Sequence, residues 1–315
     1  MKIPARLLWL VALLTAPSWA SPLTSQAVSA DATWTVYADL EQFHHTQFCP
    51  LLREELSSVG IEEKIRDFAK VFGFHPFDDV REVLLYGNGQ DPEKGVVLIR
   101  GSFDPDKVLA PIRRNSHYQE ISHGNTTLHR WLPEEPKAPG TECRMMYGGI
   151  HGDLIVMSAG LDTLRRAIDV LEGSSPRAGP GQFDPPASAS SPIFFLVAAN
   201  ATDQVVMPHC ESAIFRQTER LRLAVGEVDG QLRADLCLAA KTGETASAIA
   251  QMAQGMVAYL TLQGTDQPRL ADLAKKMRVS CENSAVRVHL ESSPKEVIQF
   301  LAEHRQRTEP SGHCP

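Results

Sequence analysis

The chain has 315 residues, of which 43% are hydrophobic and 22% charged, with a net charge of -7 and a pI near 5.9. These proportions are those of a soluble globular protein, and the length suits two domains of ordinary size. They exclude wholesale disorder and a multi-span membrane protein, and an acidic chain with no long basic run lacks the surface that nucleic-acid binding needs.

The first twenty residues have the parts of an export signal. Lys2 and Arg6 precede the apolar run Leu7–Leu14, and Ser18-Trp19-Ala20 is the small-x-small exit that signal peptidase cuts. The run is too short to span a bilayer, and no cysteine follows it closely enough to carry a lipid anchor. We therefore predict a signal peptide at 1–20 and a periplasmic or extracellular protein that does not span the membrane after cleavage.

Six cysteines follow the leader, and six thiols allow 15 pairings. Export places them in an oxidising compartment, so we expect at least one disulfide. None forms a CxxC pair, which removes the usual signal of a redox enzyme or a zinc ribbon. The possible disulfide cysteines are Cys49, Cys143, Cys210, Cys237, Cys281 and Cys314.

After the leader, residues 21–32 are small and polar without periodicity, which predicts a disordered tail. Apolar and polar residues then alternate over Trp34–Glu41, as in a strand with one buried face. Helical spacing follows over 51–56 and 61–72, with Gly60 as the break between two helices.

The most legible stretch is Val83–Arg113, which predicts two strands joined by the polar turn Gly87–Lys94 and then a helix. Asp104 is placed to cap that helix, with Pro105 at its first position, where the missing amide costs nothing. Similar hairpins or hairpin-plus-helix units are predicted at residues 118–131, 144–171, 221–256 and 277–301.

Two short motifs within these units each predict a particular local structure. Gly148-Gly149 is interpreted as part of a hairpin turn, because a strand is expected on each side of it. Ser293 and Glu296 have the spacing of a capping box, with Pro294 at the first helical position.

Residues 174–192 are built almost entirely from Gly, Ser, Pro and Ala and are predicted to be a flexible linker. They separate a first domain at 33–173 from a second at 193–307, with a C-terminal tail at 308–315. The predicted class is α+β, with two similar domains, each an antiparallel sheet with helices on one face, built from repeated β-hairpin-plus-helix units. A single sheet shared by both halves is the alternative.

No motif predicts a catalytic residue, a cofactor or a metal. His44, His45, Cys49 and His75 are the nearest approach to a metal cluster, but no fourth ligand has a fixed spacing. The sequence contains no Gly-x-Ser-x-Gly elbow, and its glycine pairs lead into strands and not into helix N-termini, unlike phosphate-binding loops.

Four aromatic side chains in predicted strands are candidate ligand-binding residues. If Tyr86, His129, Trp131 and Tyr147 share one uncovered sheet face, they line an apolar groove. The alternative is that they pair across strands and stabilise the sheet.

The sequence DDVREVLLYG followed by GVVLIRGSFDPDKV, within Phe77–Phe103, and a second stretch at Asp153–Gly173, resemble exported bacterial proteins of the DUF3352 kind, whose function is unknown. The resemblance covers about half of the chain and is carried by strand and cap positions. It implies an exported α+β repeat and transfers no functional residue.

We therefore expect a non-enzymatic exported protein that acts as a binding or envelope-associated module, with an envelope protein or a small apolar ligand as its partner. The alternative is an exported hydrolase whose site no motif reveals. Convergent carboxylates or histidines with displaced pKa values in a cleft at the junction of the two halves would favour the hydrolase.

Overall fold

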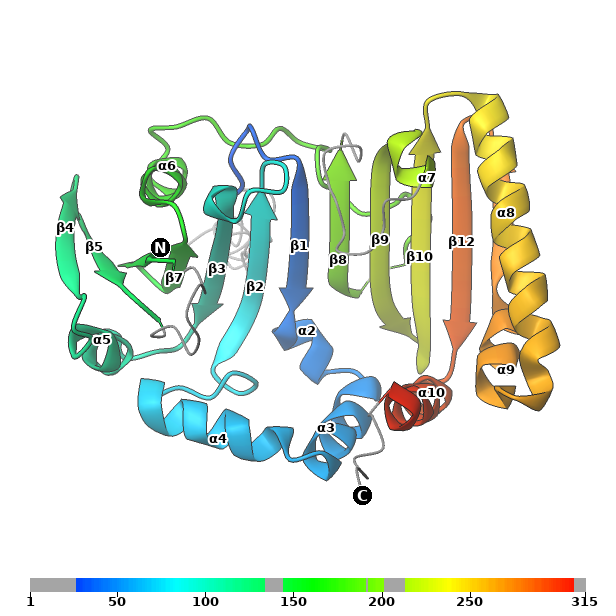
Figure 1. Ribbon diagram of the computed structural model, residues 1–315, viewed down its shortest axis with the longest axis horizontal. Coiled ribbons are helices and arrows are strands. Elements are labelled where there is room, and N and C mark those ends of the chain that lie inside the picture. The colour runs from blue at the N-terminus through cyan, green and yellow to red at the C-terminus, as the bar shows by residue number, and fades with distance from the viewer. Residues whose placement is uncertain (1–26, 134–143, 191, 201–212, 309–315) are drawn as a thin grey trace, which may run out of the picture.

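A computed structural model describes residues 27–133, 144–190, 192–200 and 213–308 of the chain. Its strands form one antiparallel sheet of twelve, in the order β11-β12-β10-β9-β8-β1-β2-β3-β7-β6-β5-β4 (Figure 1). The predicted α+β class with an antiparallel sheet is therefore confirmed. None of the helices described is long and apolar enough to cross a membrane.

The strands of the first half are β1 (Trp34–Asp39), β2 (Val80–Gly87), β3 (Gly95–Gly101), β4 (Gln119–His123), β5 (Thr126–Trp131), β6 (Met146–His151) and β7 (Leu154–Ser158). Those of the second half are β8 (Ile193–Asn200), β9 (Thr218–Val228), β10 (Gln231–Ala240), β11 (Arg278–Glu282) and β12 (Ala285–Ser292).

The helices of the first half are α2 (Leu40–His44), α3 (Phe48–Ser58), α4 (Ile61–Phe72), α5 (Pro105–Arg113) and α6 (Leu161–Leu171). Those of the second half are α7 (Ala213–Arg216), α8 (Gly243–Leu262), α9 (Pro268–Lys276) and α10 (Pro294–Thr308). The helix expected near Cys210, with Ile214 and Phe215, corresponds to α7, whereas Cys210 itself lies outside the described residues.

The two halves share one sheet because β1 pairs with β8, from Trp34 opposite Ala199 to Ala38 opposite Phe195. We had expected two separate sheets. In that arrangement each of these strands would be an edge strand with a row of unpaired amide and carbonyl groups, and pairing them removes both edges.

The sheet has two faces, which we name after the helices that lie on them. On the α6 face, Leu84, Leu98 and Val156 pack with Leu164 and Ile168 of α6. On the α5 face, Ile99, Ile155 and Met157 pack with Val108 of α5. Since neighbouring residues of a strand point to opposite faces, the first half is covered on both sides.

In the second half, helices cover one side of the sheet only. Leu221, Leu238 and Val286 lie on the α5 face and pack against Ile249 and other residues of α8. The opposite side of the same strands carries Arg222, Asp235 and other polar side chains. Helices on one face are therefore found in the second half, and the prediction is wrong for the first, where α6 and α5 lie on opposite faces.

Two stretches predicted to be flexible pack against the α6 face. Ala27 and Val28 are each 1% exposed, although they belong to the predicted tail 21–32. Phe183 is 3% exposed within the predicted linker 174–192, and the backbone of Ala178 bonds that of Val28. Few apolar residues are enough to hold these segments in place, because the sheet offers them a complementary apolar surface.

Gly148 and Gly149 lie within β6, so their interpretation as a turn is wrong. The chain reverses at Gly152 instead, which has the positive φ of 61° that glycine tolerates. A Cβ at Gly148 would lie 3.1 Å from Trp131, and one at Gly149 would lie 3.1 Å from Leu128. The two glycines thus leave room for large side chains on the neighbouring strand.

Helix starts are predicted well by their caps. The Asp104 carboxylate accepts a hydrogen bond from the amide of Asp106 at 3.0 Å, with Pro105 at the first helical position. The amide of Ser293 donates to Glu296 at 3.1 Å, and the amide of Glu296 donates to Ser293 at 3.3 Å. Both predicted caps are confirmed.

Cys49, Cys237 and Cys281 form no disulfide, whereas Cys143, Cys210 and Cys314 lie outside the described residues. Cys237 is opposite Arg287 of β12, and Cys281 is opposite Val286. Since Arg287 and Val286 are consecutive, the two thiols lie on opposite faces of the sheet and cannot bond to each other.

Candidate functional site

The candidate site is an apolar cavity of about 170 Å³ between α4, α5 and the α5 face of the first half. We call it the α4–α5 cavity. Its volume is slightly above the roughly 150 Å³ of an engineered apolar cavity that binds benzene. Its lining residues are Phe68, Phe72, Phe74, Ile99, Val108, Leu109, Ile112, His129, Trp131, Gly148, Gly149, Ile150, Ile155 and Met157.

Helix α4 covers this cavity loosely. It carries apolar residues at helical spacing, yet none of its side chains is fully buried. Phe68 lines the cavity and is 37% exposed, so it stands at the opening. Gly60 and Gly73 flank the helix with φ values of 72° and 75°, which allow the sharp turns into and out of α4. The helix thus presents an incompletely buried apolar face to the cavity.

Aromatic rings form the wall beside α4. Phe68 lies 4.6 Å from Phe72 and 5.3 Å from Phe74, and Phe74 lies 5.5 Å from Phe103, measured between ring centroids. Offset and edge-to-face contacts of this kind are favourable aromatic geometries. The packed rings give this wall of the cavity a continuous apolar surface.

Across the cavity, β5 supplies its one titratable side chain, His129, and the indole of Trp131. His129 is 4% exposed, and its burial lowers the pKa of the imidazole, with Arg113 adding to the effect and Glu120 opposing it. Nδ1 of His129 lies 2.8 Å from the hydroxyl of Tyr118, which in turn lies 2.7 Å from the carboxylate of Glu120. A neutral imidazole is therefore held at the wall of an apolar site.

The four aromatic residues predicted to share a groove do not share a face. His129 lies opposite Gly148 and, like Trp131 two residues later, points to the α5 face. Tyr86 and Tyr147 both pack into the cluster on the α6 face. Two of the four thus line the cavity, and the sequence missed its other walls because they come from helices and strands far apart in the chain.

Tyr86 lines a second cavity, of about 290 Å³, on the α6 face beside α6. Its hydroxyl is buried without a hydrogen-bond partner, and burial raises the pKa of the phenol. Two of the charges at the cavity pair with each other, since Arg166 lies 2.6 Å from Asp31. Ser29 also donates to Asp31 at 2.5 Å. This arrangement favours a structural role for the polar groups there.

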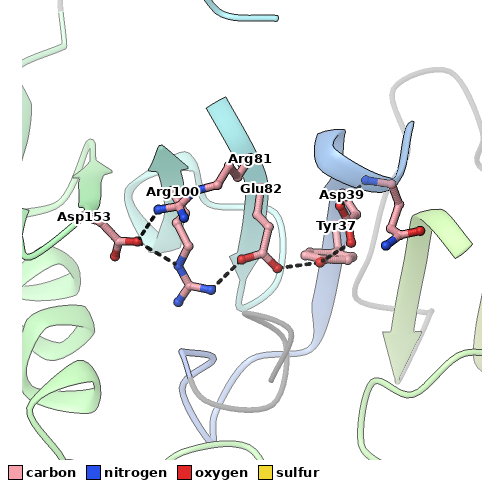
Figure 2. Close-up of polar contacts among 7 residues, drawn as sticks. Tyr37, Asp39, Arg81, Glu82, Arg100 and Asp153 are labelled. Carbon is pink, nitrogen blue, oxygen red and sulfur yellow. Dashed lines mark hydrogen bonds and ion pairs between the residues drawn. The ribbon is translucent and has the colours of Figure 1, made fainter. Parts of the chain in front are cut away.

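A polar network crosses β1, β2 and β3 near one end of these strands (Figure 2). Arg81 lies 2.8 Å from Asp153, Arg100 lies 2.5 Å from Glu82, and the hydroxyl of Tyr37 donates to Glu82 at 2.5 Å. Burial raises the pKa of both Tyr37 and Asp39, and Asp39 also caps α2 by accepting from the amide of Gln42. The network joins neighbouring strands, and none of its residues lines either cavity.

A cysteine, a histidine and an aspartate share the α6 face of the second half. Nδ1 of His289 lies 2.9 Å from Asp235, as in a catalytic triad. However, Nε2 lies 3.8 Å from Glu291, whereas Cys237 is opposite Arg287, on the other side of His289 along β12. The imidazole therefore has no thiol to activate, and this arrangement gives no support to a hydrolase.

No group of three or more His, Cys, Asp or Glu residues in the described part of the chain is arranged to hold a metal ion. His75 instead lies 3.1 Å from Asp78, and Cys49 is buried in the cluster beneath α3.

The fold as a whole is similar to solved structures of the protein TP0453. Its crystal form III aligns with a TM-score of 0.50 and 10% sequence identity, over 90% of this chain and 98% of that one. Crystal form I aligns with a TM-score of 0.47 and 11% identity over the same shares. At this identity the likeness to form III shows a shared fold and nothing more.

No protein-family model matches the chain, and no curated protein is significantly similar to it in sequence. The resemblance to DUF3352 proteins therefore stays a prediction.

Proposed function

We propose that this protein is a non-enzymatic exported binding protein that holds a small apolar molecule in the α4–α5 cavity. The observation that carries the proposal is a cavity whose lining is apolar apart from one uncharged histidine, beneath a helix with no fully buried side chain. Removing apolar ligand surface from water contributes roughly 25 cal/mol per Å². A ligand that also covers the exposed ring of Phe68 adds to this gain.

The size of the cavity limits the ligand to one ring or the end of a hydrocarbon chain. An apolar cavity of this size offers a water molecule few hydrogen-bond partners. An apolar ligand therefore fills space that would otherwise lack contacts on one side.

Toluene is a suitable first probe for the mature protein. We expect saturable binding by titration calorimetry. We expect Ile155→Phe to abolish this binding, because it puts an aromatic ring in the cavity in place of the smaller isoleucine side chain. Ile155→Leu conserves the volume and serves as the matched control. Undiminished binding by the folded Ile155→Phe protein would place the ligand elsewhere, and no binding by the wild type would exclude the proposed function.

Export is a separate part of the proposal. It is supported by the basic, apolar and small-residue segments of residues 1–20. We expect the protein recovered from an envelope fraction to begin at Ser21, as N-terminal sequencing would show. Turnover in a broad hydrolase screen of that protein would favour the alternative function.

We also infer that the two halves are similar units that arose by duplication. The strand order β1-β2-β3-β7-β6 of the first half matches β8-β9-β10-β12-β11 of the second. In both, a first strand is followed by a hairpin and a helix, and the last hairpin of the half leads into α6 or α10. On this view the β4–β5 hairpin, which carries His129, is an insertion into the first half.

A further inference from the structure

The two ring nitrogens of His129 differ in their surroundings, and the difference bears on which apolar ligands the cavity accepts. Nδ1 is engaged by the hydroxyl of Tyr118, next to the edge strand β4. Nε2 makes no hydrogen bond to any residue that the structure describes. His129 lines the cavity opposite Gly148, toward which the far edge of the Trp131 indole also turns.

Counting protons fixes which nitrogen carries the hydrogen. The hydroxyl of Tyr118 has one proton and lies 2.7 Å from Glu120 and 2.8 Å from His129. The guanidinium of Arg113, which can only donate, also hydrogen-bonds this side chain. An ionised carboxylate only accepts hydrogen bonds, so Tyr118 donates to Glu120. The oxygen of Tyr118 must then accept from Nδ1–H of His129. In a neutral imidazole, Nε2 is then an unprotonated acceptor.

The charged groups around this relay keep the imidazole neutral. Burial and Arg113 on α5 both lower its pKa, which outweighs the opposing effect of Glu120 on β4. On the cavity side the neighbours are apolar residues of α4, α5 and β6. A lone pair that faces an apolar space is an incomplete hydrogen bond, and a matching donor is worth more there than in water.

We infer that the α4–α5 cavity selects apolar molecules that carry one hydrogen-bond donor, such as a phenol or an alcohol, which donates to Nε2 of His129. This inference rests on the proposed function and specifies the ligand class. A carboxylate or phosphate would bring only acceptors and a charge into an apolar site, so the inference excludes both.

The other polar group on the lining does not reverse this preference. Trp131 turns Cη2 and Cζ3, the far edge of its indole, toward Gly148. The N–H of Trp131 therefore lies on the other edge of the ring system. Wherever that N–H points, a ligand hydroxyl can donate to His129, whereas a ligand ether cannot. Selection for a donor thus depends on His129.

Phenol, toluene and anisole share a benzene ring and separate these effects. Phenol carries a hydrogen-bond donor, toluene carries no polar group, and anisole carries an acceptor alone. Their dissociation constants are measured by titration calorimetry at pH 8 on the wild type and on His129→Phe. We expect the variant to lose about tenfold in affinity for phenol, the effect of about 1.4 kcal/mol, and to keep its affinity for toluene and anisole. Toluene binding also reports that the variant still forms the cavity.

Tyr118→Phe gives a second test outside the cavity lining. It removes the oxygen that holds the proton on Nδ1, so Nε2 becomes free to carry the proton. We expect this variant to lose most of the preference for phenol while its affinity for toluene is unchanged.

The outcomes distinguish the two proposals. If toluene and phenol both bind and His129→Phe weakens them equally, or weakens neither, the donor preference is wrong and the proposed function stands. If anisole loses as much affinity as phenol, Nε2 carries the proton and the assignment is overturned. If none of the three binds the wild type, the proposed function and this inference both fail.

Discussion

The two halves of the sheet bury their apolar residues differently. In β3 and β7 of the first half, apolar residues run without interruption, as in Val96–Ile99 and Leu154–Met157, and helices cover both faces. In β10 of the second half, leucines alternate with Arg233, Asp235 and Cys237, and helices cover one face. The comparison shows that the strand pattern itself records how many faces are covered, since continuous runs belong to strands buried on both sides.

The α4–α5 cavity lies in the first half, where helices pack on both faces of the sheet. The second half has a cavity of about 190 Å³ between α9 and α10, but its lining is mostly polar and charged, with Arg269, Asp272, Lys276 and Glu296. The apolar cavity is therefore in the half with three layers.

The strongest test of the covered α6 face is Phe183→Ala. Phe183 is 3% exposed and packs on that face, and removing a buried phenylalanine side chain costs about 3–5 kcal/mol. We expect a loss near the lower end of this range in urea unfolding, because the loop can partly relax. Ser188→Ala, at an exposed position of the same segment, is the control, and equal small effects would mean that residues 174–190 are a free linker after all.

The next test compares two cross-strand ion pairs, one on the α6 face of each half. Arg100 and Glu82 have side chains 18% and 13% exposed, whereas Arg233 and Glu291 are 25% and 44% exposed. We expect Glu82→Gln to cost about 2 kcal/mol, because it leaves a largely buried guanidinium with only the more distant Asp153, at 3.7 Å, as a charge partner. Glu291→Gln should cost under about 1 kcal/mol, as surface pairs do. Equal costs in urea unfolding would mean that the two faces are equally exposed.

A smaller effect is expected from pH, through His129. Burial lowers the pKa of this histidine, so the unfolded chain binds the proton first as the pH falls below about 6.5. We expect the free energy of unfolding to fall between that pH and the lower pKa of the folded protein. His129→Phe should reduce this fall, measured by urea unfolding at pH 7 and pH 5. His117→Gln, at an exposed position, should leave it unchanged.

The smallest effect is expected on the outer side of α8. Met252 and Met256 follow Ile249 at helical spacing along α8, yet each is 58% exposed while Ile249 is 5% exposed. Met256→Gln should change stability by less than about 0.5 kcal/mol, as surface substitutions do. Ile249→Gln should be strongly destabilising, because it buries an amide without partners. A large loss from Met256→Gln would show that this side is covered in solution.

The sequence by itself determined the local structure. Capping residues such as Asp104 and Ser293 fixed where helices begin, because their side chains bond amides only a few residues away. Alternation and turn residues likewise placed the hairpins, including the one predicted within residues 118–131, which is β4 and β5. The uninterrupted apolar runs of β3 and β7 also carried the signal of two covered faces, which we had not used.

Only the tertiary structure decided how these elements combine. The pairing of β1 with β8, which makes one sheet of two, depends on edges that are far apart in the chain. The face on which Tyr86, His129, Trp131 and Tyr147 lie depends on strand register, since a shift of one residue reverses every side chain. The α4–α5 cavity needs α4, α5 and several strands at once, and no local pattern records where such distant segments fail to fill the space between them.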